Sequence, residues 1–161
     1  MKKILSGIFS VLLLVSCTGG MNEQGSGPDG PSILGAWELE QSVWTDGDST
    51  DVWKPYKSLY LYTDKYYSTE IVTAERPNLP ESDEDRTAEV MAEAANVLIS
   101  NAGRYEIVGD SLIYYVMVSK SPDRMNTNQR VAHHIRIEQD RVILTNSEGN
   151  TSVTRTLVRM K

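Results

Sequence analysis

The feature that most constrains this sequence is a series of short strand-like segments joined by turns of hairpin length. β-Branched and aromatic residues are frequent in these segments, and turn-forming residues such as Gly109-Asp110 and Ser147-Glu148-Gly149 separate them. Because tight turns join antiparallel neighbours, the pattern predicts an all-β meander. The expected strands cover residues 34–44, 57–63, 66–73, 103–108, 111–119, 129–138, 141–146 and 151–160.

Closing such a meander removes the exposed edges of its sheet, so we expect a mainly antiparallel, eight-stranded up-and-down barrel. Residues 82–101 interrupt the series and predict one inserted α-helix, which would cap or flank the barrel interior. Ser82 suits the N-cap, and acidic residues follow it at the positive end of the helix dipole. Apolar residues then recur on one helical face, at Ala88, Met91, Ala95, Leu98 and Ala102.

Composition excludes several classes of protein. The chain has 161 residues, room for one ordinary domain, and a formal net charge of −6 without a run rich in Lys or Arg. Nucleic acid is therefore not an expected partner, because nonspecific affinity for phosphates comes from basic charge. One Cys and two His are too few for a structural zinc site, and we expect neither a metal nor a cofactor.

The first residues predict an export signal. Lys2 and Lys3 precede an apolar run over residues 4–15, which is much shorter than the roughly 20 residues that a membrane-spanning helix needs. Residues 1–16 are therefore interpreted as a signal peptide. The run ends in Leu14-Val15-Ser16-Cys17, which resembles the lipobox of bacterial lipoproteins.

That resemblance implies that Cys17 receives a diacylglyceryl thioether and becomes the new N-terminus. The protein would then be exported and lipid-anchored to a bacterial membrane, for which we expect the outer membrane. The alternative is an ordinary signal peptide whose cysteine is incidental. Residues 17–32, rich in Gly and Pro, predict a flexible tether, and residues 33–161 predict the folded domain.

An ordered series of motifs resembles the bacterial lipocalin-like domain. It begins with a Gly-x-Trp opening at Leu34-Gly35-Ala36-Trp37 and continues through Tyr60-Leu61-Tyr62-Thr63, Gly103-Arg104-Tyr105-Glu106-Ile107 and Asp140-Arg141-Val142-Ile143-Leu144. The resemblance covers nearly all of residues 33–161. It implies a small antiparallel barrel with a central cavity and an inserted helix. Where the family often has a His-His pair, this chain has Tyr114-Tyr115, so no imidazole-dependent role is carried over to these positions.

The Gly-x-Trp segment predicts how the barrel closes. An indole at the closed end covers a large apolar area, and its face attracts a guanidinium. We expect Gly35 and Trp37 to form this closure, with Arg155 or Arg159 of the last strand as the cationic partner.

The tyrosines give the best indication of a ligand. The only Phe lies in the signal, so every aromatic side chain of the mature chain carries a polar group. A cavity with such a lining offers apolar walls and a few hydroxyls that orient a small amphiphile. The alternative is that each tyrosine only fills the barrel or its rim. The candidate ligand-binding residues are Tyr60, Tyr62, Tyr114, Val116, His133 and Ile135.

His133 and His134 are adjacent on an expected strand, so their side chains should point to opposite faces and cannot chelate one ion together. Alternation places His133 inside, with Val131 and Ile135, and His134 outside. His133 is interpreted either as a core histidine that bonds a neighbouring hydroxyl or as a ligand-binding or catalytic group.

Gly109-Asp110-Ser111-Leu112 matches the signature string of the GDSL esterases. Those enzymes need an Asp-x-x-His downstream of the serine. Neither His133 nor His134 has Asp three residues before it, and no later histidine exists. The string is therefore interpreted as a hairpin turn, and no catalytic residue is assigned.

Three functions remain open on the sequence. The first is a membrane-anchored lipoprotein that binds a small hydrophobic or amphiphilic ligand in the barrel. The second is an enzyme acting on such a ligand, with His133 and a facing tyrosine as acid and base. The third is a solid barrel that binds a protein partner through its outer face, for example along the apolar strand 111–119.

Overall fold

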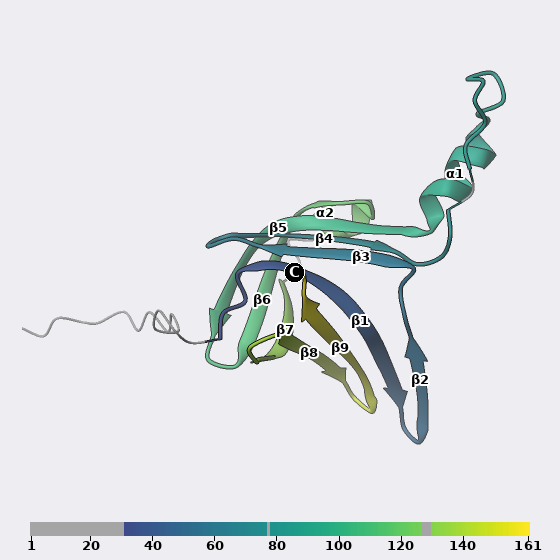
Figure 1. Cartoon of the computed structure of the whole chain (residues 1–161). Helices are drawn as coiled ribbons and strands as arrows, with labels where there is room; N and C mark the ends of the chain where they lie inside the picture. The colour runs from purple at the N-terminus through teal and green to yellow at the C-terminus, as the bar shows by residue number, and fades with distance from the viewer. Residues whose placement is uncertain (1–30, 77, 127–129) are drawn as a thin grey trace, which may run out of the picture.

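A computed structural model describes residues 31–76, 78–126 and 130–161 (Figure 1). The expected signal peptide, Cys17 and most of the expected tether lie outside the described residues. In chain order the elements are β1 (Gly35–Asp46), β2 (Ser49–Trp53), β3 (Lys57–Tyr62), β4 (Tyr66–Val72), α1 (Ala88–Asn96), β5 (Leu98–Val108), β6 (Ser111–Ser119), α2 (Pro122–Asn126), β7 (Arg130–Ile137), β8 (Arg141–Glu148) and β9 (Thr151–Arg159).

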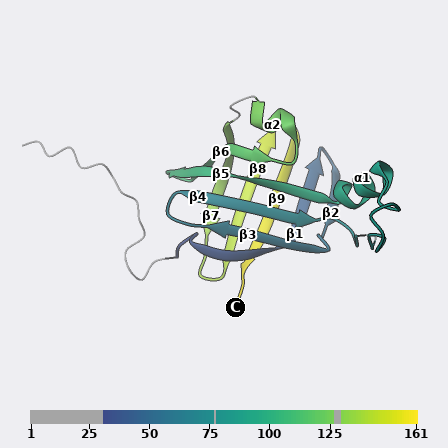
Figure 2. The ribbon, with the colours of Figure 1, turned by 90° about the horizontal axis from the view of Figure 1, so that it is seen from above.

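The strands form one closed antiparallel barrel. From β3 to β9 each strand pairs with the next in sequence, and β1 pairs with both β3 and β9, which closes a ring of eight. Figure 2 shows β3 to β6 crossing over β8 and β9, as the tilted walls of a barrel do. This confirms the expected eight-stranded barrel. Among the described residues there is a ninth strand, β2, which lies outside the ring and pairs with β1 alone.

Strand β1 changes partner along its length. Its beginning, Gly35 to Trp37, pairs with β3, whereas its end, Ser42 to Asp46, pairs with β2. The pairing with β9 shifts register between Leu39 and Gln41. Such a bulge adds one residue to the strand and so changes which side chains face inward. Trp37 and Leu39 face the core before the bulge, and Ser42 and Trp44 face the interior after it.

The apolar core fills the end of the barrel where β1 begins and β9 ends. Alternation along each strand brings one apolar side chain after another to this interior. The fully buried side chains are Trp37, Leu112, Val142, Leu144 and Leu157.

Gly103 lies at a second bulge, where the pairing of β5 with β6 shifts between Ala102 and Gly103. A Cβ atom at this position would lie 2.0 Å from the carbonyl oxygen of Tyr115. The strands therefore approach each other here at a distance that only glycine permits.

The helix is shorter than the sequence predicts. It covers Ala88–Asn96 in place of 82–101, and Thr87, not Ser82, is its N-cap and accepts a hydrogen bond from the Val90 backbone N–H. Leu98 and Ala102, expected on the helical face, belong to β5 and pair with β4. The residues from Val97 onward suit a strand as well as a helix, and the available edge of β4 decides between the two.

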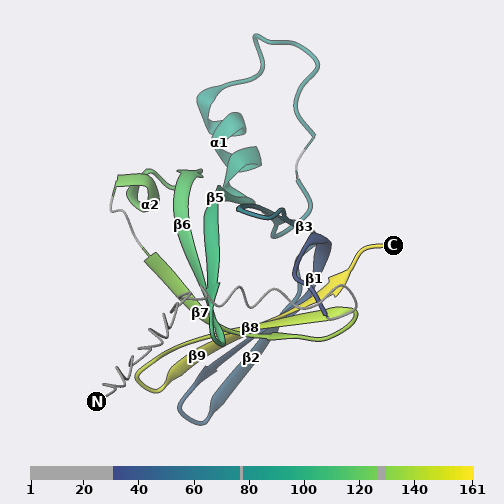
Figure 3. The ribbon, with the colours of Figure 1, turned by 90° about the vertical axis from the view of Figure 1, so that its left-hand side faces the viewer.

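Figures 1 and 3 show α1 projecting outward from the barrel at the start of β5. No described helix has both the length and the apolar character needed to cross a membrane.

Candidate functional site

One end of the barrel is sealed by Trp37. Its side chain is fully buried, and the indole N–H donates to the Ile33 carbonyl oxygen at 2.7 Å. The Arg159 guanidinium covers the ring at 4.0 Å from its centre. Gly35 has a φ of 116° and leaves room for Arg159, whose Nη1 atom would lie 3.1 Å from a Cβ there. Of the two arginines expected at this closure, the structure places Arg159 there.

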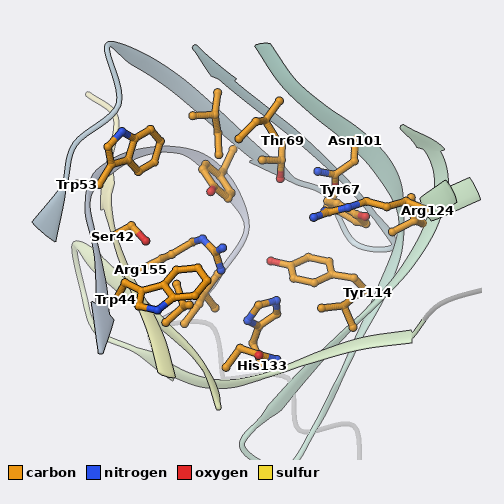
Figure 4. Close-up of a pocket in the computed structure, with 18 of the residues that line it drawn as sticks. Ser42, Trp44, Trp53, Tyr67, Thr69, Asn101, Tyr114, Arg124, His133 and Arg155 are labelled. Carbon is orange, nitrogen blue, oxygen red and sulfur yellow. The ribbon is translucent and has the colours of Figure 1, made fainter. Parts of the chain in front are cut away.

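The other end of the barrel holds a cavity of about 510 Å³ (Figure 4). It lies within the range of about 300–1,000 Å³ that is usual for small-molecule sites. Every strand and α2 contribute at least one side chain to its wall. Its aromatic lining is Trp44, Trp53, Tyr60, Tyr67 and Tyr114, and its aliphatic lining is Ile71, Ile99, Val116, Val131, Leu144 and Val153.

Four of the six candidate ligand-binding residues line this cavity: Tyr60, Tyr114, Val116 and His133. The other two do not. Ile135 and Tyr62 are buried in the core cluster of the barrel. The Tyr62 hydroxyl lies 2.5 Å from that of Tyr114, so it positions a cavity residue without lining the cavity.

The tyrosines form a connected cluster beside the cavity. The Tyr67 and Tyr114 ring centres are 4.4 Å apart, and those of Tyr114 and His133 are 5.5 Å apart with an edge-on geometry. Burial raises the pKa of Tyr60 and of Tyr67 to about 12. It also raises the pKa of Tyr62 and of Tyr114 well above the usual value for a phenol. These hydroxyls are therefore uncharged at neutral pH.

His133 points into the barrel, as alternation predicts, and only 8% of its surface is exposed. Burial first, and then the positive charge of Arg155, lower its pKa to about 4, so the ring is neutral at pH 7. One interpretation of the sequence expected His133 to hydrogen-bond a neighbouring hydroxyl. The structure shows no such bond, and the Nδ1 atom has no hydrogen-bond partner among the described residues. His134 is exposed, and its Nε2 lies 3.1 Å from an Asp110 carboxylate oxygen.

Three charged side chains line the cavity together with the neutral His133. Arg155 comes from β9, Arg124 from α2 and Asp51 from β2. Figure 4 shows the Arg155 guanidinium directed across the cavity toward Tyr114. None of the ion pairs in the described part of the chain involves Arg155, Arg124 or Asp51.

The acid–base pair required by the enzyme hypothesis is not formed. The Tyr114 hydroxyl bonds Tyr62 instead of His133, and within the described ranges no tyrosine hydroxyl or carboxylate is hydrogen-bonded to His133. Those ranges also hold no group of three metal-ligating side chains. The cavity contradicts the hypothesis of a solid barrel.

The sequence missed part of this site. Strand β2 carries Trp53 and Asp51. The signal for this strand is the Asp46-Gly47 pair before it, because Asp-Gly is a preferred hairpin turn. Gly47 adopts the positive φ, 54°, that such a turn requires. Arg124 lies on α2, a helix too short to leave a periodic signal.

Residues 34–160 match the family described as lipocalin-like domain, and the chain belongs to that family. Among solved structures, it is similar to a lipocalin-like protein from Bacteroides uniformis, with 11% identity and a TM-score of 0.46 over 80% of this chain and 98% of that one. It is also similar to an uncharacterized protein from Bacteroides eggerthii, with 10% identity and a TM-score of 0.45 over 78% and 98% of the respective chains. The curated proteins include no match. A lipocalin-like barrel with a cavity suits the binding of a small hydrophobic ligand in general.

Proposed function

We propose that this protein is an exported lipoprotein, anchored at a bacterial membrane through Cys17, that binds a small hydrophobic or amphiphilic molecule in its barrel. The observation that carries the binding proposal is the cavity of about 510 Å³, open to a ligand at one end of the barrel while Trp37 seals the other. Membership of the lipocalin-like family agrees with it.

The lining of the cavity supports an amphiphile more than a purely polar ligand. Aromatic and aliphatic side chains form most of the wall, and burying apolar surface against them yields about 25 cal/mol per Å². The polar groups lie between these apolar side chains and come from different strands, among them Ser42, Thr69 and Asn101. Such a site binds an apolar body and uses isolated polar contacts to orient it.

The experiment that tests binding is native mass spectrometry of the mature chain, residues 17–161, produced without the leader so that no acyl chain is attached. We expect a retained or exchangeable ligand of lipid-like mass at one copy per chain. A protein that carries no such ligand, and that takes up none when incubated with a lipid extract, would contradict the proposal.

The anchoring proposal rests on the sequence Leu14-Val15-Ser16-Cys17. Several acyl chains anchor a protein stably where one chain is marginal, because each buried CH₂ adds about 0.8 kcal/mol. Cys17→Ala should therefore move the protein from the membrane fraction to the soluble fraction of its host. Ser16→Ala, which keeps both the cysteine and a small residue before it, serves as the control. A Cys17→Ala protein that stays with the membranes would disprove the acyl anchor.

A further inference from the structure

Arg155 is a cation placed inside the barrel. It belongs to the inward-facing row of β9, between Val153, which lines the cavity, and Leu157, which is fully buried. In the described part of the chain its guanidinium has no carboxylate within 4.0 Å and no hydrogen-bond partner that would fix it. A partly buried charge without a partner costs folding free energy, and the chain bears this cost at Arg155 in its binding cavity.

The cavity offers Arg155 no counter-charge of its own. Its tyrosines are protonated at neutral pH, as any phenol is, and burial raises their pKa further, while burial lowers the pKa of His133 and keeps its ring neutral. The single acidic side chain of the lining is Asp51, on the outlying strand β2, and it forms no ion pair with Arg155. Arg124 adds a second positive charge to the wall. The lining thus carries more positive than negative charge.

Two further groups in the same cavity lack a partner. The Tyr67 hydroxyl and the His133 Nδ1 atom are buried, and neither has a hydrogen-bond partner among the described residues. Buried polar atoms are almost always satisfied, by protein, water or ligand. A phenol O–H donates, and a neutral imidazole donates from Nδ1 when it carries its proton there. The Tyr67 hydroxyl is therefore an unused donor in the cavity wall, and His133 is a second one in the tautomer that is protonated at Nδ1.

We propose that the ligand carries an anionic oxygen headgroup, a carboxylate or a phosphate monoester, that Arg155 binds inside the barrel while the apolar body of the ligand contacts the aromatic and aliphatic wall. This inference rests on the proposed binding function. The planar guanidinium matches two oxygens of such a headgroup at once, which gives short, charge-assisted hydrogen bonds.

The first test compares ligands of equal chain length on the unaltered mature chain, residues 17–161. Isothermal titration calorimetry, with each probe below its micellar concentration, measures the affinity for dodecanoate, dodecyl phosphate, dodecanol and dodecylammonium. We expect at least one of the two anions to bind about 10- to 100-fold more tightly than the alcohol, and the cation to bind most weakly. The tighter of the two anions identifies the headgroup.

The second test removes the charge. Arg155→Met keeps the length of the side chain and should lower the affinity for the preferred anion to that for dodecanol, while the affinity for dodecanol changes little. Arg155→Lys should retain part of the preference for the anion, because lysine keeps the positive charge but lacks the planar guanidinium that bonds two oxygens at once. Arg136→Met is the matched control: it makes the same change in net charge on an exposed residue that pairs with Glu138, and it should leave all affinities unchanged.

The outcomes separate the two proposals. Equal affinity of the unaltered chain for anions and alcohol would overturn the headgroup assignment and leave the binding function in place. Failure to bind any of the four probes would overturn the binding function as well. An anion preference that survives in Arg155→Met would overturn the role of Arg155. If Arg155→Met does not fold, Arg155→Lys and the comparison of probes on the unaltered chain still decide the matter.

Discussion

Arg159 and Trp37 join the first strand of the barrel to the last at its closed end. The guanidinium stacks 4.0 Å from the centre of the indole and donates to the carbonyl oxygens of Leu34 and Ser32 at 2.9 and 2.7 Å. One side chain of the last strand thus fixes both the ring that seals the barrel and the segment that enters the first strand.

Removing this guanidinium should destabilise the barrel. Arg159→Met loses a cation–π contact and three charge-assisted hydrogen bonds, the third to the Gln139 carbonyl oxygen at 3.4 Å, which together predict a loss of about 2–4 kcal/mol in the free energy of unfolding. Urea denaturation followed by circular dichroism measures it. Arg136→Met, on the exposed outer face, is the control and should stay within about 0.5 kcal/mol of the unaltered protein. An equal effect of both variants would mean that Arg159 has no special role.

Gly103→Ala should separate β5 from β6. The added methyl group would meet the Tyr115 carbonyl oxygen at 2.0 Å, and backbone atoms cannot move aside cheaply. Overpacking of this kind predicts a loss of about 1–3 kcal/mol or more in stability. Gly47→Asn is the comparison, since a side chain there meets open space and asparagine tolerates positive φ. A neutral Gly103→Ala variant would disprove the close approach of these strands.

His133 should make the stability of the fold depend on pH. Its pKa is about 4 in the folded chain and about 6.5 in the unfolded chain, so the unfolded chain binds the proton first. The stability that the neutral ring contributes is complete above pH 6.5 and is lost as the pH falls toward 4. The loss amounts to at most about 1.4 kcal/mol per pH unit and about 3 kcal/mol in total.

Urea unfolding of the unaltered chain and of His133→Gln between pH 7.5 and 4 isolates this contribution from that of the carboxylates. As the pH falls, the unaltered chain should lose more unfolding free energy than the His133→Gln variant does. Parallel pH profiles would contradict the low pKa of His133.

Filling the cavity should abolish binding without unfolding the barrel. Val116→Trp places an indole in the cavity and should weaken dodecanol binding at least about 10-fold, whereas Met117→Trp, at a neighbouring position that is 58% exposed, should not. Calorimetric titration of both variants provides the measurement. Unchanged affinity in Val116→Trp would place the binding site elsewhere on the protein.

Most of the barrel could be predicted from the sequence, because strands of period two and hairpin turns leave a local signal. The opposite directions of His133 and His134 follow from the same period. The limits of the helix could not be predicted in this way. Leu98 and Ala102 continue the helical face, but their pairing with β4 is a long-range contact that no local pattern reveals.

The cavity was predictable only in part. Alternation places Tyr60, Tyr114, Val116 and His133 inside, and all four line the cavity. The same rule cannot place Trp44. After the bulge that follows Leu39, the residues of β1 that face the interior are those that alternation alone would place on the outside. Arg155 and Arg159 share one face of β9, so periodicity alone cannot tell which of them reaches Trp37 and which lies in the cavity.

The central claim, that a ligand occupies this end of the barrel, can be tested with the three tryptophans of the chain. Trp44 and Trp53 line the cavity, whereas Trp37 is fully buried at the sealed end. A dodecanol brominated at the end of its chain quenches indole fluorescence on contact. It should quench the emission of the mature chain, and it should leave the emission of a Trp44→Phe, Trp53→Phe variant, which retains only Trp37, unchanged while still binding. Quenching of Trp37 alone, or binding without quenching of Trp44 and Trp53, would contradict the account.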